Sequence, residues 1–256
     1  MKIEKHIRFK KYIDFFKEEK DISMKAYLNL AELENIPLIT ARRDLKELIN
    51  LNYIYQELGL IKLVENKEYE TTRIEKQAKN KEEKNNIAKL AVKELNADEI
   101  FISAGTTMEN FVKNIDRPIK IVYTNGFEIA RLANSNKNIH RVVIIGGKLR
   151  LQSSALCGPI ANKTVEDLRF SQSFITVTNI DKNFFLYNNN DDEAELIKLV
   201  IKNSNNVICL VDSSKFNPTP SGSKIVDSSK IDLFLTNEEI IKKEFENIKS
   251  HIDIKW

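Results

Sequence analysis

The sequence predicts an α/β protein in two parts, a small winged helix-turn-helix followed by a larger domain built on a mostly parallel sheet. Residues 1–65 hold three short helical patterns and a candidate hairpin. From residue 85 to residue 256, apolar strands alternate with amphipathic helices. The stretch 66–84 between them is highly charged and poor in large apolar residues, so we expect a solvated helix or semi-rigid linker there.

Composition limits the class of protein. The 256 residues, 42% apolar and 30% charged, can bury a sizeable core, and the net charge of +3 does not by itself indicate an acidic partner. The two cysteines lie far apart and the three histidines are isolated, which predicts neither a disulfide nor a metal site, and we expect no cofactor. No apolar run approaches the roughly 20 residues of a membrane span, so we expect a cytoplasmic protein without membrane contact.

The first two helices and the hairpin are indicated by apolar spacing and by caps. A first helix is expected across residues 7–16, and Ser23 is placed to cap a second helix that ends at the Asn35-Ile36-Pro37 stretch. Residues 53–56 and 60–64 read as the two strands of a hairpin. Three short helices with a tight second connection are typical of a helix-turn-helix, and the hairpin would be its wing.

The third helix begins near Leu38 and is expected to have two faces. The apolar side is assigned Ile39, Leu45, Leu48, Ile49 and Leu51, and the outer side is assigned Thr40, Arg42, Arg43 and Lys46. Arginines can reach phosphates or guanine edges, and a threonine near the helix start can contact a phosphate or a thymine methyl. An arginine pair alone is more often a solvated helix face, but the ordered set of helices and hairpin favours DNA binding.

One acidic residue on this helix needs a different explanation. Asp44 follows the arginine pair directly. It can pair with an arginine or accept a hydrogen bond from a backbone N–H in the first turn.

The segments 31–33 and 36–45 resemble the amino-terminal signature of the DeoR family of bacterial transcription regulators. The resemblance implies a winged helix that docks its third helix in the major groove of DNA. The chain departs from the family pattern at Ala41, where an Ile is usual, and in lacking a Gly-Gly pair after the wing. These departures could alter its affinity for DNA.

In the second domain, strands are expected at residues 99–103, 119–123, 142–145, 173–177, 206–211 and 233–235. Ligands of parallel sheets lie beyond the carboxyl ends of the strands. Most of the glycines lie at or shortly after such ends, namely Gly105, Gly126, Gly146, Gly147 and Gly158. Each alone could be a helix cap or a turn, but together they favour a shared pocket.

Polar residues at these strand ends fit a small phosphorylated and hydroxylated ligand. Thr106 and Thr107 open a helix whose first N–H groups lack intrahelical partners and suit a phosphate, although Thr106 could simply cap the helix. Thr124 and Asn125 follow the second strand. Lys215 could hold a phosphate.

Acidic residues could hold the hydroxylated part of the ligand. Asp212 could accept hydrogen bonds from sugar hydroxyls, or it could pair with Lys215. Asp191 and Glu193 begin another helix, where they could complement its dipole or contact hydroxyls.

The segments 104–107, 124–125, 145–147, 158–159 and 212–215 occur in the order and spacing of the DeoR sensor domain, which extends the resemblance. It implies a fold related to ribose-5-phosphate isomerase and a sugar-phosphate effector. Glu83-Lys84 before Ile87-Ala88 matches the entrance to that domain, which makes Lys84 a candidate anion contact. Residues 168–171, 179 and 192–194 look most like the lactose phosphotransferase repressor branch, which implies tagatose 6-phosphate as inducer.

We therefore expect a DNA-binding transcriptional regulator that represses a sugar-utilisation operon. It would bind operator DNA as a homodimer or homotetramer, and a sugar phosphate would release it from the DNA. A sugar-phosphate isomerase is the alternative, because the implied fold is shared and Asp191, Glu193 or Asp212 could act as a base. The DNA-binding pattern argues against an enzyme. A DNA binder without a ligand is disfavoured by the polar rim of the larger domain.

Overall fold

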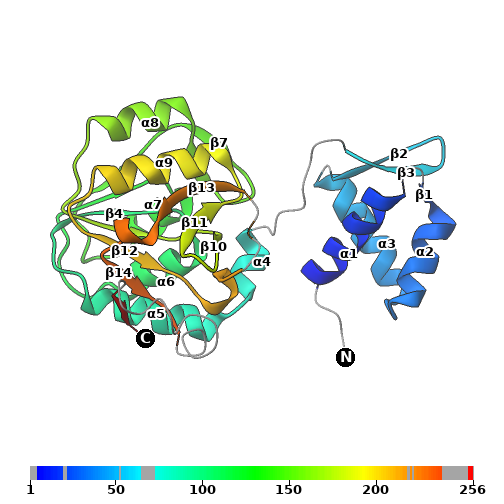
Figure 1. Cartoon of the computed structure of the whole chain (residues 1–256), viewed down its shortest axis with the longest axis horizontal. Coiled ribbons are helices and arrows are strands. Elements are labelled where there is room, and N and C mark those ends of the chain that lie inside the picture. Colours follow the sequence, from blue (N-terminus) through cyan, green and yellow to red (C-terminus); the bar gives the residue numbers. More distant parts are fainter. Residues whose placement is uncertain are drawn as a thin grey trace. The chain divides into compact units, whose positions relative to one another are not determined.

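The computed structural model divides the chain into two compact units, Met1–Thr71 and Thr72–Trp256. It describes residues 5–19, 22–51, 53–64, 73–217, 220, 222–237 and 253–255. The second unit includes part of the stretch expected to be a linker, because helices α4 (Arg73–Ala78) and α5 (Lys81–Lys93) form there (Figure 1). Helix α5 carries an apolar stripe, Ile87, Ala88 and Ala91, that is buried in the core of this unit.

The first unit is a winged helix-turn-helix. Its helices are α1 (Lys5–Glu18), α2 (Met24–Leu33) and α3 (Leu38–Asn50), and its antiparallel sheet has the order β1-β3-β2, with β1 (Ile22–Ser23), β2 (Ile54–Glu57) and β3 (Leu60–Leu63). The predicted cap is present, since the Ser23 hydroxyl accepts a hydrogen bond from the Ala26 N–H at 3.2 Å. Strands β2 and β3 form the predicted hairpin.

A buried ion pair joins α1 to α3. Arg8 donates from Nε to Asp44 Oδ2 at 2.6 Å and from Nη2 to Asp44 Oδ1 at 3.0 Å. Nearby, the Tyr27 hydroxyl donates to the backbone oxygen of Ala41 at 2.8 Å and ties α2 to α3. Of the two roles open to Asp44, the structure therefore shows pairing with an arginine, which fixes the orientation of α3.

Ile39 corrects the predicted apolar side of α3. Its side chain is 86% exposed, whereas Leu45 and Leu48 are buried. Residues two apart on a helix do not face each other, so Ile39 cannot share the face that buries Ala41. The assignment of Ile39 to the core of this unit is wrong.

The second unit is built on a seven-stranded sheet whose order is β15-β14-β12-β9-β4-β5-β6, with every neighbouring pair parallel. This confirms the predicted α/β fold with a mostly parallel sheet. The strands are β4 (Glu99–Ile102), β5 (Ile121–Thr124), β6 (Val142–Ile144), β9 (Gln172–Ile175), β12 (Val207–Leu210), β14 (Leu233–Leu235) and β15 (Ile254–Lys255).

Helices cover both faces of this sheet (Figure 1). Successive side chains of a strand point to opposite faces. In β4, Ile100 and Ile102 pack into the apolar cluster that contains α5, α6 (Thr106–Asn114) and α7 (Phe127–Asn134). Phe101 packs into the other cluster, with α8 (Pro159–Glu166) and α9 (Asp191–Lys202).

Smaller elements that were not predicted complete the unit. Strands β10 (Asn179–Ile180), β11 (Phe185–Asn188) and β13 (Ser223–Asp227) form an antiparallel sheet, and β7 (Lys148–Arg150) pairs with β8 (Ala155–Cys157). Two short 3₁₀ helices are η1 (Ser213–Lys215) and η2 (Ser228–Lys230). Both cysteines are buried free thiols.

The strand order places a switch point between β4 and β9. From β4 the chain moves outward to β5 and β6, and then returns to the other side of β4 for β9, β12 and β14. In open parallel sheets, ligands bind in the crevice beyond the carboxyl ends of the strands where the order reverses in this way. The loops after β4 and β9 therefore mark the expected position of a ligand.

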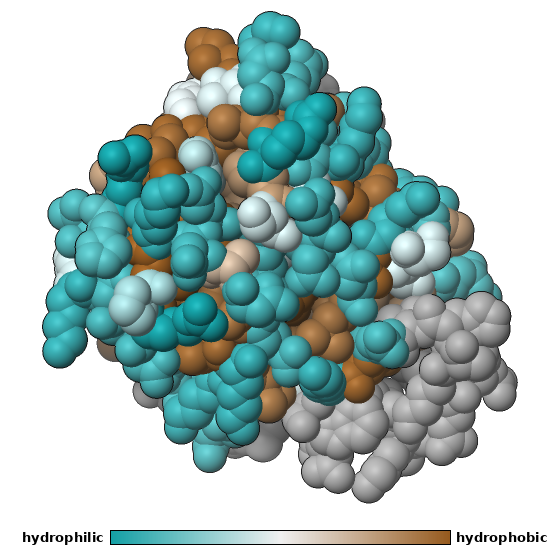
Figure 2. Space-filling view, turned by 90° about the vertical axis from the view of Figure 1, so that its left-hand side faces the viewer, coloured by the Kyte–Doolittle hydropathy of each residue, from teal (hydrophilic) through white to brown (hydrophobic). Residues whose placement is uncertain are grey.

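Polar side chains cover most of the face shown in Figure 2, and apolar residues appear there as patches between them. Within the described part of the chain, no helix is long and apolar enough to cross a bilayer. The same residues contain no cluster of three histidine, cysteine or acidic side chains that could hold a metal ion.

Candidate functional site

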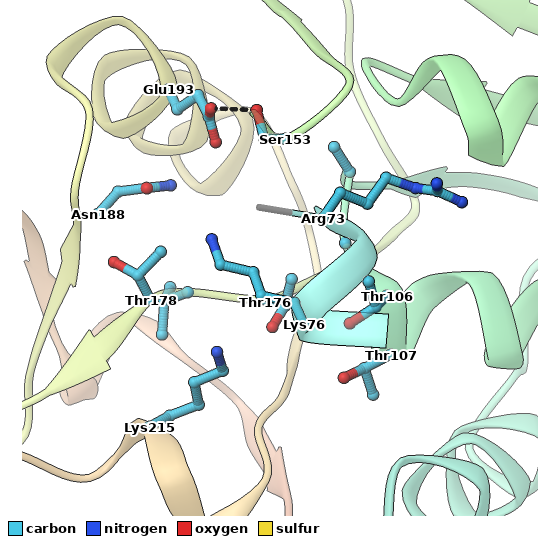
Figure 3. Close-up of a pocket in the computed structure, with 13 residues that line it drawn as sticks. Arg73, Lys76, Thr106, Thr107, Ser153, Thr176, Thr178, Asn188, Glu193 and Lys215 are labelled. Atoms are coloured by element: carbon cyan, nitrogen blue, oxygen red, sulfur yellow. Dashed lines mark hydrogen bonds between the residues drawn. The ribbon is translucent and has the colours of Figure 1, made fainter. Parts of the chain in front are cut away.

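A cavity lies at the switch point of the sheet, between the loops that follow β4 and β9 (Figure 3). All of its lining residues belong to the second unit. They are Arg73, Lys76, Ala104, Gly105, Thr106, Thr107, Ser153, Thr176, Val177, Thr178, Asn188, Glu193 and Lys215. Five of the residues predicted from the sequence are among them: Gly105, Thr106, Thr107, Glu193 and Lys215.

The start of α6 forms one wall of the cavity. Gly105 is required there, because its φ is +154° and a Cβ at this position would lie 2.5 Å from Cγ2 of Thr176. The hydroxyl of Ser103 also accepts a hydrogen bond from the Thr176 N–H at 3.1 Å, which holds the two loops together. Thr106 and Thr107 follow at the helix start, where backbone N–H groups lack intrahelical partners. This wall can donate hydrogen bonds to an anion.

Two lysines supply positive charge to the cavity. Lys76 comes from α4 and Lys215 from η1, and Figure 3 shows both ammonium groups pointing into the cavity. Burial lowers the pKa of Lys215, and Asp212 opposes this effect, while the neighbouring charges of Lys76 and Lys84 add to it, so that the pKa of Lys215 is about 8. A bound anion would offset the cost of holding this ammonium group away from water.

Arg73 has its guanidinium turned away from the two lysine ammonium groups (Figure 3). It donates from Nε to Glu109 Oε1 at 2.7 Å and from Nη2 to Glu109 Oε2 at 2.9 Å. Its backbone N–H donates to the oxygen of Gln152 at 2.8 Å. The ion pair holds α4 against α6, and the backbone bond ties α4 to the connection between β7 and β8. Together they position Lys76, which lies on the same short helix.

The opposite side of the cavity carries a carboxylate. Glu193 Oε1 accepts from the Ser153 hydroxyl at 2.6 Å, as Figure 3 shows, and from Arg150 Nη1 at 3.1 Å. Asn188 lies beside it in the cavity wall. The cavity thus has cations and helix N–H groups on one side and a carboxylate with an amide on the other, which suits a ligand with an anionic and a hydroxylated end.

Two predicted ligand contacts lie behind the cavity wall. Lys84 is buried and its Nζ donates to the backbone oxygens of Lys76 and Lys79, the latter at 2.7 Å, so it closes the turn between α4 and α5. Asp212 is also buried and its Oδ1 accepts from Asn80 Nδ2 and from the Ser214 N–H, each at 3.0 Å. Burial opposes its ionisation, but Lys215, Ser214 and Lys84 outweigh that effect and lower the pKa of Asp212. Both residues support Lys76 and Lys215 from behind.

The remaining predicted residues also lie outside the lining. Thr124 Oγ1 accepts from the Gly126 N–H at 2.9 Å, and Asn125 Oδ1 accepts from the Ala104 N–H at 3.0 Å, so this pair fixes the loop after β5 and the loop after β4. Asp191 accepts a hydrogen bond from the Ser223 hydroxyl.

Gly147 is required by a close approach of the backbone, whereas Gly146 shows no such requirement. A Cβ on Gly147, whose φ is +146°, would lie 2.7 Å from the backbone oxygen of Cys157, and Gly146 has no atom within 4 Å of such a Cβ. Among the glycines expected to share a pocket, only Gly105 lines the cavity. Gly126 and Gly158 precede the first residues of α7 and α8.

Several lining residues were missed from the sequence. Thr178 follows the predicted strand 173–177 and could have been found by the rule that selected Thr106. Thr176 was expected inside that strand, but β9 ends at Ile175, so Thr176 lies in the loop after it. Ser153 and Asn188 come from the β7–β8 connection and from β11, which were not predicted. Lys76 lies in the charged stretch 66–84, which is expected to be a solvated helix or linker, and no sequence signal places it over the cavity.

The outer face of α3 in the first unit forms a second candidate site. Arg42, Arg43 and Lys46 are exposed and Thr40 is partly exposed. Together with Ile39, the three cations occupy positions i, i+3, i+4 and i+7, so they form one stripe along the helix. A cationic stripe on the third helix of a winged helix-turn-helix has the chemistry to contact DNA phosphates and bases.

Comparisons of the sequence with known proteins agree with one another. The family of the DeoR C terminal sensor domain matches residues 79–238. The HTH-type transcriptional regulator GlpR of Haloferax volcanii is 31% identical over 213 residues, which cover 82% of each chain. The lactose phosphotransferase system repressor of Staphylococcus epidermidis is 27% identical over 223 residues, covering 86% of this chain and 88% of the repressor. Among solved structures, ribose 5-phosphate isomerase A from Neisseria gonorrhoeae is similar with a TM-score of 0.39 and 16% identity, covering 58% of this chain and 56% of the isomerase.

Proposed function

This chain belongs to the DeoR family of transcriptional regulators, and on that premise we propose that it represses a sugar-utilisation operon until a phosphorylated sugar binds its second unit. The relatives reported above are named as regulators, and the chain is a regulator and not an enzyme. The first unit would bind operator DNA through α3.

One observation carries the proposal of a phosphorylated ligand: the start of α6 and two lysines converge on a single cavity. Backbone N–H groups at a helix start, with the Thr106 and Thr107 hydroxyls, can bind phosphate oxygens. Lys76 and Lys215 add two ammonium groups from other elements. A dianionic phosphate is the small group that uses all of these donors together.

The other side of the cavity supports a sugar hydroxyl at the far end of the ligand. Glu193 is partnered by Arg150 and Ser153, so its charge is already compensated. A carboxylate in that state accepts a hydrogen bond from a neutral hydroxyl, whereas an ammonium group on the ligand would meet the competing guanidinium of Arg150. This favours a phosphorylated sugar that carries only hydroxyl groups at its other end over an amino-sugar phosphate. Tagatose 6-phosphate, which the sequence resemblance implies, meets the requirement.

For regulation, the ligand must bind one conformational state of the protein more tightly than the other. We propose that a homodimer or homotetramer presents paired winged helices to operator half-sites in the cytoplasm. The sugar phosphate would then favour an arrangement that does not match the half-site spacing.

The proposal is tested by fluorescence anisotropy of the full chain with labelled promoter-proximal duplex DNA. We expect tight binding in buffer, release on addition of tagatose 6-phosphate or a related sugar phosphate, and no release with free tagatose or inorganic phosphate. DNA binding that no sugar phosphate changes would overturn the effector assignment. Failure to bind DNA under any condition, with turnover of the sugar phosphate, would favour the isomerase instead.

A further inference from the structure

Ile39 stands at the head of the cationic stripe on α3. It is the second residue of the helix, and Arg42 and Arg43 follow it at i+3 and i+4. Its side chain is 86% exposed within a unit that buries most of its large apolar side chains. An isolated exposed isoleucine needs no explanation on most surfaces, but this one shares its face with the residues assigned to DNA.

The orientation of α3 is fixed, so the exposure of Ile39 follows from the fold. The buried Arg8–Asp44 pair and the Tyr27–Ala41 hydrogen bond hold the opposite side of the helix. Leu45 and Leu48 complete that buried side. Rotation of the helix to cover Ile39 would break these contacts.

The charge around Ile39 selects its partner. Arg42, Arg43 and Lys46 make the surrounding face cationic, which disfavours an apolar protein surface and favours a polyanion. In the major groove of DNA, the apolar feature is the C5-methyl group of thymine. The first residues of a recognition helix are those that contact base edges.

We propose that Ile39 contacts a thymine methyl in the major groove and so determines one base of each operator half-site. The inference rests on the proposed function and adds to it a base preference. Along the helix axis, Ile39 and Arg42 are about 4.5 Å apart at 1.5 Å per residue, slightly more than one base-pair step of about 3.4 Å. The thymine should therefore lie next to, or one step beyond, the base pair that Arg42 reaches.

The test replaces thymine by deoxyuridine, which removes only the methyl group. Duplexes that bind the full chain are first selected from a random pool, and each thymine of the selected site is then replaced in turn. At one position per half-site, the replacement should lower the affinity of the wild-type protein about fourfold. This is the expected effect of removing one methyl group from an apolar contact. Ile39→Ala should bind more weakly and show no difference between thymine and deoxyuridine at that position.

Two variants control the interpretation. Ile39→Val keeps an apolar β-branched side chain and should still discriminate against deoxyuridine. Leu33→Ala removes a side chain that is 81% exposed at the end of α2, outside the stripe, and should behave as wild type. All variants should keep the wild-type melting temperature, because the substituted side chains are exposed.

Several outcomes would overturn the inference while leaving the proposed function intact. One is that no replacement of thymine by deoxyuridine changes the affinity of the wild-type protein. Another is that Ile39→Ala loses as much affinity as wild type on the same replacement. If Ile39→Ala no longer formed the wild-type oligomer but kept the wild-type base preference, Ile39 would belong to a protein interface instead. Failure to bind any duplex would remove the proposed function and this inference with it.

Discussion

Arg73 of α4 and Glu109 of α6 form a bidentate ion pair, with Nε to Oε1 at 2.7 Å and Nη2 to Oε2 at 2.9 Å. Glu109 is 2% exposed. It lies on α6 three residues after Thr106, which lines the cavity. Arg73 lies three residues before Lys76, which extends into the cavity. The pair therefore links the two elements that approach the proposed phosphate from different sides.

Glu109→Gln should destabilise the second unit and weaken effector binding. The substitution keeps the shape of the side chain but removes the buried carboxylate that Arg73 contacts in two places, and leaves it the more distant carboxylate of Glu128 at 3.6 Å. We expect a loss of about 1–3 kcal/mol for a buried charged partner. Because α4 is then held less firmly, Lys76 should contribute less to binding of a sugar phosphate. Urea unfolding measures the first effect, and calorimetric titration with the sugar phosphate measures the second.

Lys163→Ala is the matched control for this prediction. It breaks an exposed ion pair with Glu166, 3.1 Å long, on α8. Exposed pairs of this kind contribute little to stability, so neither measurement should change. An equal loss of stability in both variants would contradict a special role for the Arg73–Glu109 pair.

Lys215→Met and Arg43→Ala should separate the two binding activities. Loss of the ammonium group should reduce affinity for the sugar phosphate by about 10-fold to 100-fold, since a hydrogen bond to a charged group contributes about 1.5–3 kcal/mol. DNA binding without effector should be unchanged. Arg43→Ala should show the reverse pattern in anisotropy and calorimetry. If each folded variant lost both activities, the assignment of the two sites would be wrong.

The sheet and the winged helix were predictable because local signals there agree with the fold. The strands at the centre of the sheet are short, largely apolar runs that alternate with amphipathic helices, and Ser23 caps α2 as its position predicted. The small antiparallel sheet was not predictable in the same way. Strand β10 has two residues, and β11 follows Phe184, whose φ of +58° is unusual for a bulky side chain.

The composition of the cavity was only partly predictable. The rule that ligands lie beyond the carboxyl ends of parallel strands finds candidate residues, but it does not tell which way their side chains point. Asp212 and Asn125 lie at strand ends as expected, yet neither side chain lines the cavity. Asp212 accepts a hydrogen bond from the Ser214 N–H two residues on, and Asn125 accepts one from the Ala104 N–H of the neighbouring loop. Lys76 shows the opposite error, since its helix looks solvated in sequence and is placed by the contact of Arg73 with Glu109. Such contacts join residues far apart in the chain, which no local pattern reports.

Effector affinity should fall as the pH rises from 7 to about 9.5. The pKa of Lys215 is lowered from its usual 10.5 to about 8, so the free protein loses this charge through that range. A phosphate remains dianionic above pH 7, because its second pKa is about 6, so the change reports on the protein. Binding should also be accompanied by proton uptake near pH 8, which calorimetry in buffers of different ionisation enthalpy measures.

Lys215→Arg is the control for the pH dependence. Arginine stays charged throughout the range, so the affinity of this variant should vary much less with pH. A wild-type affinity that is constant from pH 7 to 9.5 would contradict the titration of Lys215.

The same shift predicts how stability without effector changes with pH. The unfolded chain holds the Lys215 proton up to about 10.5, whereas the folded chain releases it near 8. Between these values the unfolded state binds more protons, so this group makes the free energy of unfolding rise with pH. Lys215→Met should remove that contribution. Urea unfolding of both proteins at pH 7.5 and pH 9.5 measures the difference, and an equal pH dependence in the two would contradict it.

Gly105→Ala should impair both the fold and the proposed phosphate contact. The new Cβ would lie 2.5 Å from Cγ2 of Thr176, at a φ of +154° that residues with a side chain rarely adopt. Relief of the clash requires the loops after β4 and β9 to separate, which displaces the start of α6. We expect a loss of about 1–3 kcal/mol in the free energy of unfolding, typical of backbone strain, together with weaker effector binding.

Gly146→Ala is the matched control, since its new Cβ would meet no atom within 4 Å. This variant should unfold and bind effector as wild type does. Adding Thr176→Ser to Gly105→Ala removes the methyl group that causes the clash but not the backbone strain, so the double variant should regain part of the lost stability. If Gly105→Ala matched Gly146→Ala in urea unfolding and in calorimetry, the close approach of the two loops would not be what requires a glycine.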